Sequence, residues 1–323
     1  MYFLHGLGDN ITRCDNEMHF ANLAERFGWV IVVPQAPSVS GITMWNAGLG
    51  GTADDAGFLL ALLDTLADNG LVNPDSVFFS GFSMGGFMTH RMAIEHGDRI
   101  TACAPVSGLI SHAFANHVPT TPVRMMHIHG TTDDVVGWNG GSSYFGNIGI
   151  SVDSLVCFWT GWNNCGTDPT VDTLPDRVND GLRFVRHTYS GEAEFQLLKV
   201  IGGTHTWYLD SNSHDIDYFE EIHSFFIGKN HSDNQATVQP ENLENAKPNF
   251  EVWPNPAAGF INIRTSEPLL LTLYDCRGIA VMRQKIASGA TSIDLHDMPQ
   301  GIYLLSDNTG ATYKIMNLAG AKR

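Results

Sequence analysis

Short apolar runs alternate with longer amphipathic stretches over the first two-thirds of the chain. The apolar runs are continuous rather than strictly alternating, as in WVIVV (29–33), VRMMHIHG (123–130) and FQLLKVIGG (195–203). Stretches with helical character, such as DDAGFLLALLDTLADNG (54–70), separate them. Continuous apolar strands are typical of a parallel sheet covered on both faces, and parallel strands need crossover connections. The pattern therefore predicts an α/β domain over residues 1–229, with a mostly parallel sheet and helices on both faces.

The pattern changes near residue 230. Residues 230–248 are polar, rich in Asn and without periodicity, which is typical of a linker. Residues 249–323 contain short alternating runs such as FINIRT (260–265) and LLLTLYD (269–275), separated by Gly and Asn turns. We predict a small all-β sandwich there, so that the chain has two domains joined by a linker.

Composition excludes some classes of function. The chain has 323 residues, 16% of them charged, and a formal net charge of −16. An acidic protein repels a phosphate backbone, so nucleic acid is not an expected partner. No apolar run reaches the roughly 18 residues of a membrane span. The five cysteines have no metal-type spacing. Cys157 and Cys165 are near enough in sequence to pair, and isolated buried thiols are an equally good interpretation.

One apolar run leads directly into a serine between glycines. In SVFFSGFSMGG (76–86), Gly81 and Gly85 stand two residues before and after Ser83. A sharp strand-to-helix turn strains the central residue and leaves no room for side chains at these flanking positions. Such a turn would expose the Ser83 hydroxyl and direct the first helix amides toward its target. The alternative is a glycine-rich helix for which Ser83 is only an N-cap, but the strand before it and the helix pattern after it favour the turn.

A nucleophilic serine needs a base, and the base needs an acid that orients it. The strand 123–130 is followed by a loop with Asp133 and Asp134, either of which could be the acid. The strand 195–203 is followed by His205, the candidate base. His127 and His129 alternate along one strand and suggest a metal pair, but no third ligand is near, so we expect core or supporting histidines.

A tetrahedral intermediate also needs two backbone N–H donors for its oxyanion. The amide of Met84 directly follows the nucleophile. The second donor should come from the loop after an early strand, and YFLHGLGDN (2–10) offers the amide of Leu7. Gly6 and Gly8 could also be ordinary turn residues with no part in an oxyanion hole.

These motifs together carry a family resemblance. LHGLGD, MWNAG, GFSMGGFMTHRMA, HGTTDDVV and GGTHTW occur in the order found in α/β-hydrolase esterases of the polyhydroxybutyrate depolymerase and feruloyl esterase type. The resemblance implies a Ser83 nucleophile, an Asp133 acid and a His205 base. It also implies a secreted enzyme with no metal or organic cofactor. Its substrate would be a polymeric ester, either feruloyl or acetyl esters of plant polysaccharide or a polyhydroxyalkanoate.

The second domain resembles the C-terminal sorting domain of type IX secretion substrates. FEVWPNPAAGFINI, SIDLHDMPQGIYLLS and YKIMN carry this resemblance. It implies the type IX secretion machinery as a partner, and export across a Bacteroidota-type outer membrane to the medium or the cell surface. A carbohydrate-binding β-sandwich is the alternative.

Three tryptophans are candidates for substrate contact. Trp45, Trp138 and Trp207 lie in or beside loops at the carboxyl ends of predicted strands, where ligands bind in open α/β sheets. Their indole faces suit sugar or hydroxycinnamoyl rings, and support of the loops is the alternative role.

A different class of function also stays open, because the same fold could serve as a catalytically silent binding module.

The resemblance also predicts that the chain lacks its beginning. The family normally has two strands before the one with the HG loop, whereas here that strand starts at Met1. Sorted proteins also need a signal peptide, and the first residues have no such pattern. Both expectations are met if Met1 is internal to a longer reading frame; a minimal domain that dimerises at its edge is the alternative.

Overall fold

The computed structural model describes residues 1–209, 213–228, 250–275, 280–299, 301–307 and 312–317. The chain divides into two compact units, Met1–Asp233 and Asn234–Arg323. The predicted linker, 230–248, lies outside the described residues. No helix in the described part of the chain has the length and apolar character that a membrane span requires.

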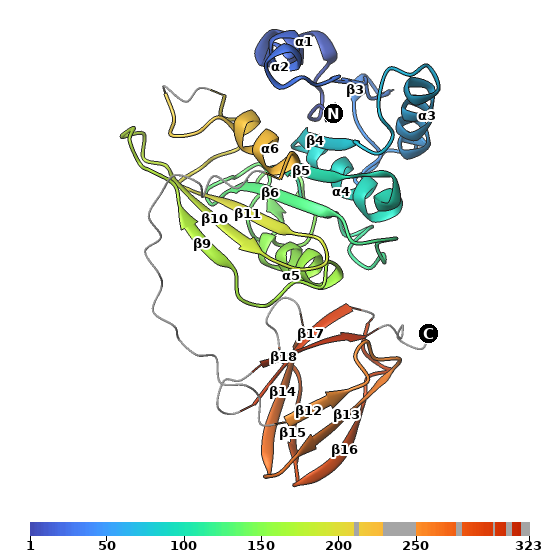
Figure 1. Cartoon of the computed structure of the whole chain (residues 1–323), viewed down its shortest axis with the longest axis vertical. Coiled ribbons are helices and arrows are strands. Elements are labelled where there is room, and N and C mark those ends of the chain that lie inside the picture. The colour runs from blue at the N-terminus through green and yellow to red at the C-terminus, as the bar shows by residue number, and fades with distance from the viewer. Residues whose placement is uncertain (210–212, 229–249, 276–279, 300, 308–311, 318–323) are drawn as a thin grey trace. The chain divides into compact units, whose positions relative to one another are not determined.

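The first unit is built on a seven-stranded sheet (Figure 1). Its first five strands in spatial order run parallel, and the last two are antiparallel additions at one edge. The spatial order is β1 (Tyr2–Leu4), β4 (Phe78–Phe82), β5 (Ala102–Val106), β6 (Arg124–Gly130), β11 (Phe195–Ile201), β10 (Arg183–Tyr189) and β9 (Thr170–Thr173). Two short hairpins lie in the connections: β2 (Ser38–Val39) with β3 (Ile42–Thr43), and β7 (Gly141–Ser142) with β8 (Gly146–Asn147).

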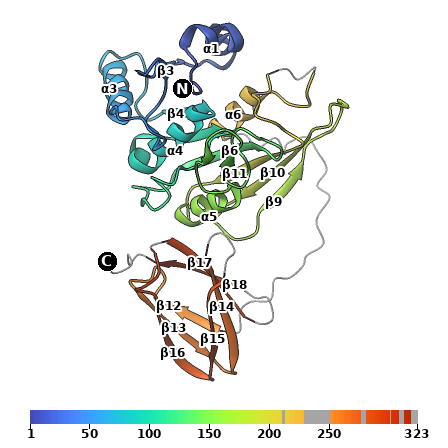
Figure 2. The same ribbon diagram turned by 180° about the vertical axis from the view of Figure 1, so that it is seen from behind.

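Helices cover both faces of this sheet (Figure 2), because neighbouring strand residues point to opposite sides and both sets are apolar. Tyr2 and Leu4 pack in one core with three of the helices, whereas Phe3 packs in the other core with the remaining three. The first face carries α3 (Asp55–Asp68), α4 (Met84–His96) and α5 (Val152–Trp162); the second carries α1 (Ile11–Met18), α2 (Phe20–Phe27) and α6 (Tyr218–Phe226). A 3₁₀ turn (Gly97–Arg99) follows α4. The predicted α/β class is thereby confirmed.

The second unit consists of two antiparallel sheets. A three-stranded sheet has the order β12 (Phe250–Trp253), β13 (Phe260–Thr265) and β16 (Gly289–Asp294). A four-stranded sheet has the order β15 (Ala280–Ile286), β14 (Leu269–Asp275), β17 (Gly301–Ser306) and β18 (Thr312–Asn317). Alternating apolar residues of both sheets, among them Ile261, Ile263, Leu271 and Leu273, form one buried core. The small all-β domain is confirmed as a fold.

One predicted strand is wrong. Residues 29–33 form only an isolated bridge, in which Val32 pairs with Tyr2. The Phe3 amide donates to the Val32 carbonyl at 2.9 Å, and the Val32 amide donates to the Met1 carbonyl at 2.8 Å. Pairing then stops at Pro34, which has no N–H to continue a ladder. An apolar run was therefore not sufficient to make a full strand here.

Candidate active site

Ser83 occupies the sharp turn between β4 and α4. Its backbone lies at φ 55° and ψ −119°, a strained conformation for a residue with a side chain. The turn is held because the Ser83 amide donates to the carbonyl of Val106 at 2.9 Å. The Ser83 side chain is half-buried, so the turn presents the hydroxyl at the carboxyl end of β4.

The flanking glycines are required by packing against backbone atoms. A Cβ on Gly85 would lie 1.9 Å from the carbonyl oxygen of Leu4. A Cβ on Gly81 would lie 2.5 Å from the carbonyl oxygen of Gly85. Because backbone cannot give way as a flexible side chain can, the helix and strands approach this closely only with glycine at both positions.

Asp133 and His205 are brought together by the loops that follow β6 and β11. The Nδ1 of His205 lies 2.8 Å from Oδ2 of Asp133. The other carboxylate oxygen accepts hydrogen bonds from the amides of Val135 at 3.0 Å and Val136 at 2.8 Å. Burial alone would raise the pKa of Asp133, but the His205 and Val136 hydrogen bonds outweigh it, so that the pKa falls below its ordinary value. An ionised Asp133 holds the Nδ1–H tautomer of His205 and leaves Nε2 as an acceptor.

Asp134 has a different environment. Its side chain is exposed, and its carbonyl accepts a hydrogen bond from the amide of Ser143 at 3.0 Å. Of the two adjacent aspartates, Asp133 is therefore the one whose carboxylate bonds to His205.

Between the described residues Ser83 and His205 no hydrogen bond forms. The His205 ring packs on Phe82, with ring centroids 4.7 Å apart. Catalytic contacts of this kind are often long before substrate binds.

The loop that carries Leu7 lies directly beside Ser83. A Cβ on Gly6 would lie 3.6 Å from Cβ of Ser83. The Met84 amide is at the first residue of α4, where helix N–H groups have no partner within the helix. Among the backbone hydrogen bonds of the described residues, neither the Leu7 nor the Met84 amide has an acceptor. Both amides are thus available on the two sides of the serine.

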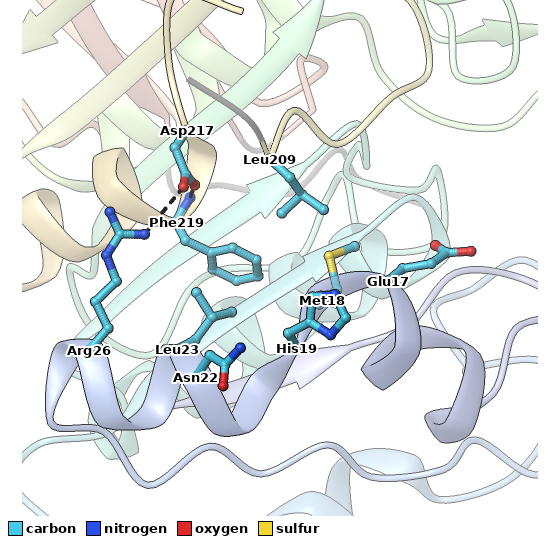
Figure 3. A pocket seen from close by; sticks show the side chains of 9 residues that line it. All are labelled: Glu17, Met18, His19, Asn22, Leu23, Arg26, Leu209, Asp217 and Phe219. Atoms are coloured by element: carbon cyan, nitrogen blue, oxygen red, sulfur yellow. Dashed lines mark hydrogen bonds and ion pairs between the residues drawn. The ribbon is translucent and has the colours of Figure 1, made fainter. Parts of the chain in front are cut away.

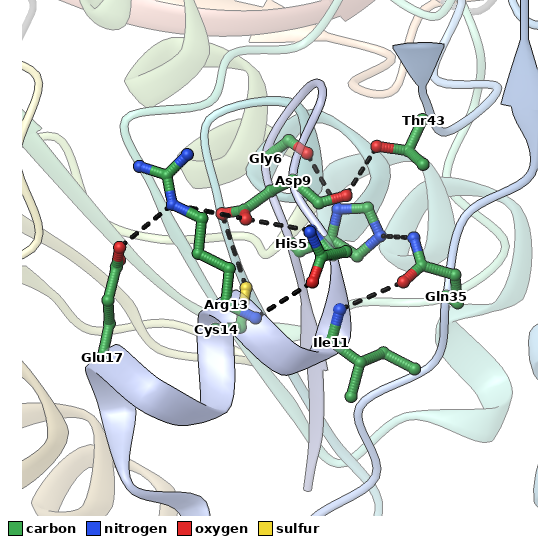
Figure 4. A network of polar contacts seen from close by, with 10 residues as sticks. His5, Gly6, Asp9, Ile11, Arg13, Cys14, Glu17, Gln35 and Thr43 are labelled. Atoms are coloured by element: carbon green, nitrogen blue, oxygen red, sulfur yellow. Dashed lines mark hydrogen bonds and ion pairs between the residues drawn. The ribbon is translucent and has the colours of Figure 1, made fainter. Parts of the chain in front are cut away.

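Two hydrogen bonds of the His5 ring fix the position of this loop (Figure 4). The Ala36 amide donates to its Nε2 at 3.1 Å, which makes Nε2 the acceptor and Nδ1 the protonated atom. Nδ1 then donates to the carbonyl of Gly6 at 2.8 Å. Burial lowers the pKa of His5 below its ordinary value, so that the neutral form needed for both contacts is favoured. Sequence reasoning missed His5, whose only signal is its place before Gly6.

The three predicted substrate tryptophans have different surroundings. Trp45 is fully buried and donates its Nε1–H to the carbonyl of His5 at 3.0 Å. Of the two predicted roles, support of the loop is the one that this geometry favours for Trp45. Trp138 is half-buried, lies edge-on to His129 with centroids 5.9 Å apart, and donates to Asp153 at 3.3 Å. Trp207 is 8% exposed, and within the described structure its Nε1 has no hydrogen-bond partner.

Sequence reasoning did not identify the exposed aromatic surface beside the acid loop. Tyr144 and Phe145, at the tip of the β7–β8 hairpin, are 70% and 59% exposed. A hydrogen bond from the Ser143 amide to the Asp134 carbonyl joins the hairpin to the loop after β6, which contains Asp133. Glycine-flanked aromatics in GGSSYFGN were the available signal.

A chain of buried histidines supports the acid loop from the core. Trp159 Nε1–H can only donate, and it lies 3.1 Å from Nδ1 of His90. The Nε2–H of His90 then donates to Nδ1 of His127 at 3.3 Å, and that of His127 donates to Nδ1 of His129 at 3.2 Å. His129 completes the chain by donating to the carbonyl of Val136 at 2.8 Å. Each member has one donor and one acceptor role, which only the neutral form can fill.

The surroundings of this chain keep it neutral. All three histidines have no exposed surface. Burial lowers the pKa of His90 to about 3 and also lowers the pKa of His127 and His129, although Asp133 opposes the shift at His129. In the described part of the chain, no group of three or more His, Cys, Asp or Glu side chains is placed to hold a metal ion. The hydrogen bonds of His127 and His129 agree with the core or supporting role expected for them.

A cleft of about 280 Å³ opens beside His205. Gly6 and Phe82, the neighbours of Ser83, line one end of it, together with His205 and Trp207. Side chains of α1 and the loop before it also line the cleft: Asp9, Arg13, Cys14, Glu17 and Met18. The cleft thus leads from His205 to the surface of α1.

Comparison with known families assigns the second unit. Residues 251–318 match the model described as a secretion system C-terminal sorting domain. The second unit is similar to this family of sorting domains over these residues. The match confirms the predicted resemblance over this part of the chain and indicates a secreted or cell-surface protein.

Curated relatives resemble part of the chain. A bifunctional acetylxylan esterase/xylanase of Neocallimastix patriciarum is 30% identical over 135 residues, which are 42% of this chain and 19% of that protein. Feruloyl esterase B of Piromyces equi is 32% identical over 103 residues, which are 31% of this chain and 19% of that protein. The match thus spans about a fifth of the length of each relative. The names of both relatives agree with the predicted resemblance to esterases.

Solved structures of esterases resemble the chain at low sequence identity. An acetyl xylan esterase from Aspergillus awamori has a TM-score of 0.47 and 17% identity, with 68% of this chain and 87% of that chain covered. Esterase PE8 has a TM-score of 0.44 and 18% identity, with 70% of this chain and 90% of that chain covered.

Proposed function

We propose that the protein is a secreted serine esterase that hydrolyses acetyl or feruloyl esters on plant polysaccharide. The observation that carries the proposal is the convergence of three strand ends. Ser83 stands on a strained turn at the end of β4, and the hydrogen-bonded pair of Asp133 and His205 follows β6 and β11. Relatives named acetylxylan and feruloyl esterases support the choice of ester.

The reaction would proceed through an acyl-enzyme. Ser83 Oγ attacks the carbonyl carbon of the ester while His205 Nε2 takes the hydroxyl proton. The Leu7 and Met84 amides donate to the oxyanion that forms. The carbon–oxygen bond to the alcohol then breaks, and His205 returns the proton to the leaving oxygen. Water repeats the sequence on the acyl-enzyme and releases the acid.

Asp133 has two tasks in this mechanism. It orients the His205 ring through Nδ1, and its negative charge stabilises the imidazolium that forms when Nε2 is protonated. The low pKa of Asp133 suits both tasks because the carboxylate stays ionised. The two valine amides that bind the other carboxylate oxygen fix its direction.

The sorting domain gives the proposed enzyme its route out of the cell. We propose that the type IX secretion machinery recognises residues 251–318, as the family match suggests. The substrate would then be a polymer met outside the cell, which agrees with an esterase acting on polysaccharide.

A hydrolysis panel tests the proposal. Purified protein is incubated with methyl ferulate, acetylated xylan and polyhydroxybutyrate, and the released acids are measured by chromatography. We expect acetate from xylan, ferulate from the methyl ester, or both. Release of hydroxybutyrate alone would replace the proposal with a polyester depolymerase. No release from any of the three would favour a catalytically silent module.

A further inference from the structure

The cleft beside His205 does not end at α1. A second hollow of about 240 Å³ lies between the α1–α2 segment and the start of α6 (Figure 3). Glu17, Met18 and Leu209 line both hollows, so the two are contiguous. Together they form a groove that leads from His205 along α1 to α2 and the first turn of α6.

The far half of this groove combines an apolar floor with a polar rim. Met18, Leu23, Leu209 and Phe219 point toward one another in Figure 3 and form the floor. A few polar groups around an apolar surface are the usual anatomy of a site for a small ligand. A ligand that fits must therefore present an apolar face together with polar edges.

Both arginines that line the groove are paired with carboxylates. Arg26 pairs with Asp217 at 3.5 Å and also with Glu220. Arg13, at the near end, pairs with Glu17 at 3.1 Å. Among the described residues that line the groove, neither arginine is thus free to bind an anionic ligand. Asn22 adds an exposed side-chain amide that is both donor and acceptor and, among the described residues, bonds to no protein group.

We propose that this groove binds the sugar chain that carries the ester, as the leaving alcohol of the reaction. This inference rests on the proposed esterase function. The pyranose ring has an apolar C–H face, suited to the floor, and hydroxyl edges that both donate and accept. The groove starts at His205, the group that must protonate the leaving oxygen, so the alcohol and not the acyl group belongs on this side of Ser83.

The rim distinguishes this ligand from a polyester. Arg13 donates to one oxygen of Glu17, and the remaining lone pairs of that carboxylate can only accept hydrogen bonds, so they call for a further donor. Sugar hydroxyls supply donors, whereas a polyhydroxyalkanoate chain has ester oxygens and no donor along its length. The groove therefore selects for polysaccharide.

Blocking the groove tests the inference. Asn22→Trp places a large side chain in it, and Asn22 is exposed, so the α2 helix can carry the change. Glu25→Trp is the matched control, because Glu25 is exposed on the same helix and does not line the groove. Binding of an unsubstituted xylo-oligosaccharide is measured by calorimetry on the Ser83→Ala background, which requires no activity. We expect Asn22→Trp to weaken binding by about tenfold, roughly 1.4 kcal/mol, and Glu25→Trp to leave it unchanged.

Kinetics provide the second readout. The ratio of kcat/KM for an acetylated xylo-oligosaccharide to that for p-nitrophenyl acetate should fall about tenfold in Asn22→Trp and stay constant in Glu25→Trp. Equal binding by both variants, or no binding by the parent, would overturn the groove assignment even where p-nitrophenyl acetate is hydrolysed. Failure of the unmodified protein to hydrolyse p-nitrophenyl acetate would instead overturn the esterase function.

Discussion

At the level of single residues, substitutions of the adjacent Asp133 and Asp134 should differ most clearly in their effect on kcat. We expect Asp133→Asn to lower kcat on p-nitrophenyl acetate by about 10³- to 10⁴-fold, because an amide in that place no longer stabilises the imidazolium or holds the right tautomer. Asp134→Asn should change kcat less than about threefold, since its exposed carboxylate does not contact His205. Steady-state kinetics on both variants decide the matter. Reversed effects would make Asp134 the acid.

A catalytic role could be proposed from the sequence where the residue directly follows a recognisable strand. It could not be proposed where the role depends on contacts with residues far away in the sequence. Ser83, Asp133 and His205 each follow a recognisable strand, and parallel strands end at one edge of a sheet. Trp45 also follows such a pattern, yet it is buried against His5 by contacts across 40 positions of sequence. His90 likewise bonds to Trp159 on α5 and to His127 on β6. Tertiary packing brings these residues together, and the periodicity of the sequence does not predict it.

At the scale of elements, the contact between α4 and β1 is the tightest constraint on the serine turn. Gly85→Ala would put a methyl group 1.9 Å from the carbonyl oxygen of Leu4 and force the two elements apart. We expect a loss of about 3 kcal/mol or more in unfolding free energy, or failure to fold. Gly166→Ala is the control, because nothing lies within 4 Å of the added atom. Its unfolding free energy, measured in urea, should change by less than about 0.5 kcal/mol. Comparable losses in both variants would contradict the packing argument.

The periodicity of the sequence predicts the parallel strands of the first unit and helices such as α3, because buried parallel strands and amphipathic helices have distinct patterns. It did not predict the antiparallel strands β9 and β10 or the helices α1 and α2, and it predicted a full strand over residues 29–33 that does not form. Their apolar character is that of a strand, but pairing with β1 is limited to the neighbourhood of Val32. Whether an apolar run becomes a full strand depends on partners on each side, which the run itself does not specify.

At the scale of the whole molecule, the buried histidines make stability depend on pH. His90 titrates near pH 6.5 in an unfolded chain but near pH 3 in the folded protein. Between these values the unfolded state binds more protons, so the unfolding free energy falls as pH falls below about 6.5. His127 and His129, whose pKa values are also lowered, act in the same direction. Each histidine contributes a slope of up to about 1.4 kcal/mol per pH unit.

Urea titrations between pH 7.5 and pH 4.5, followed by tryptophan fluorescence, measure this slope. His90→Gln should reduce the slope by about one proton and lower stability at pH 7.5. His112→Gln, at an exposed position outside the chain of histidines, should leave the slope unchanged. A His90→Gln slope equal to that of the unmodified protein would show that His90 is not buried in its neutral form.

The central claim is that Ser83 is a nucleophile activated by His205 and Asp133. The most direct measurement is reaction with a fluorophosphonate, followed by mass spectrometry of the intact protein and of its peptides. We expect one adduct per molecule, located on the peptide that contains Ser83, absent in Ser83→Ala and formed far more slowly in His205→Ala. No adduct, or an adduct on another residue while ester hydrolysis persists in Ser83→Ala, would contradict the claim.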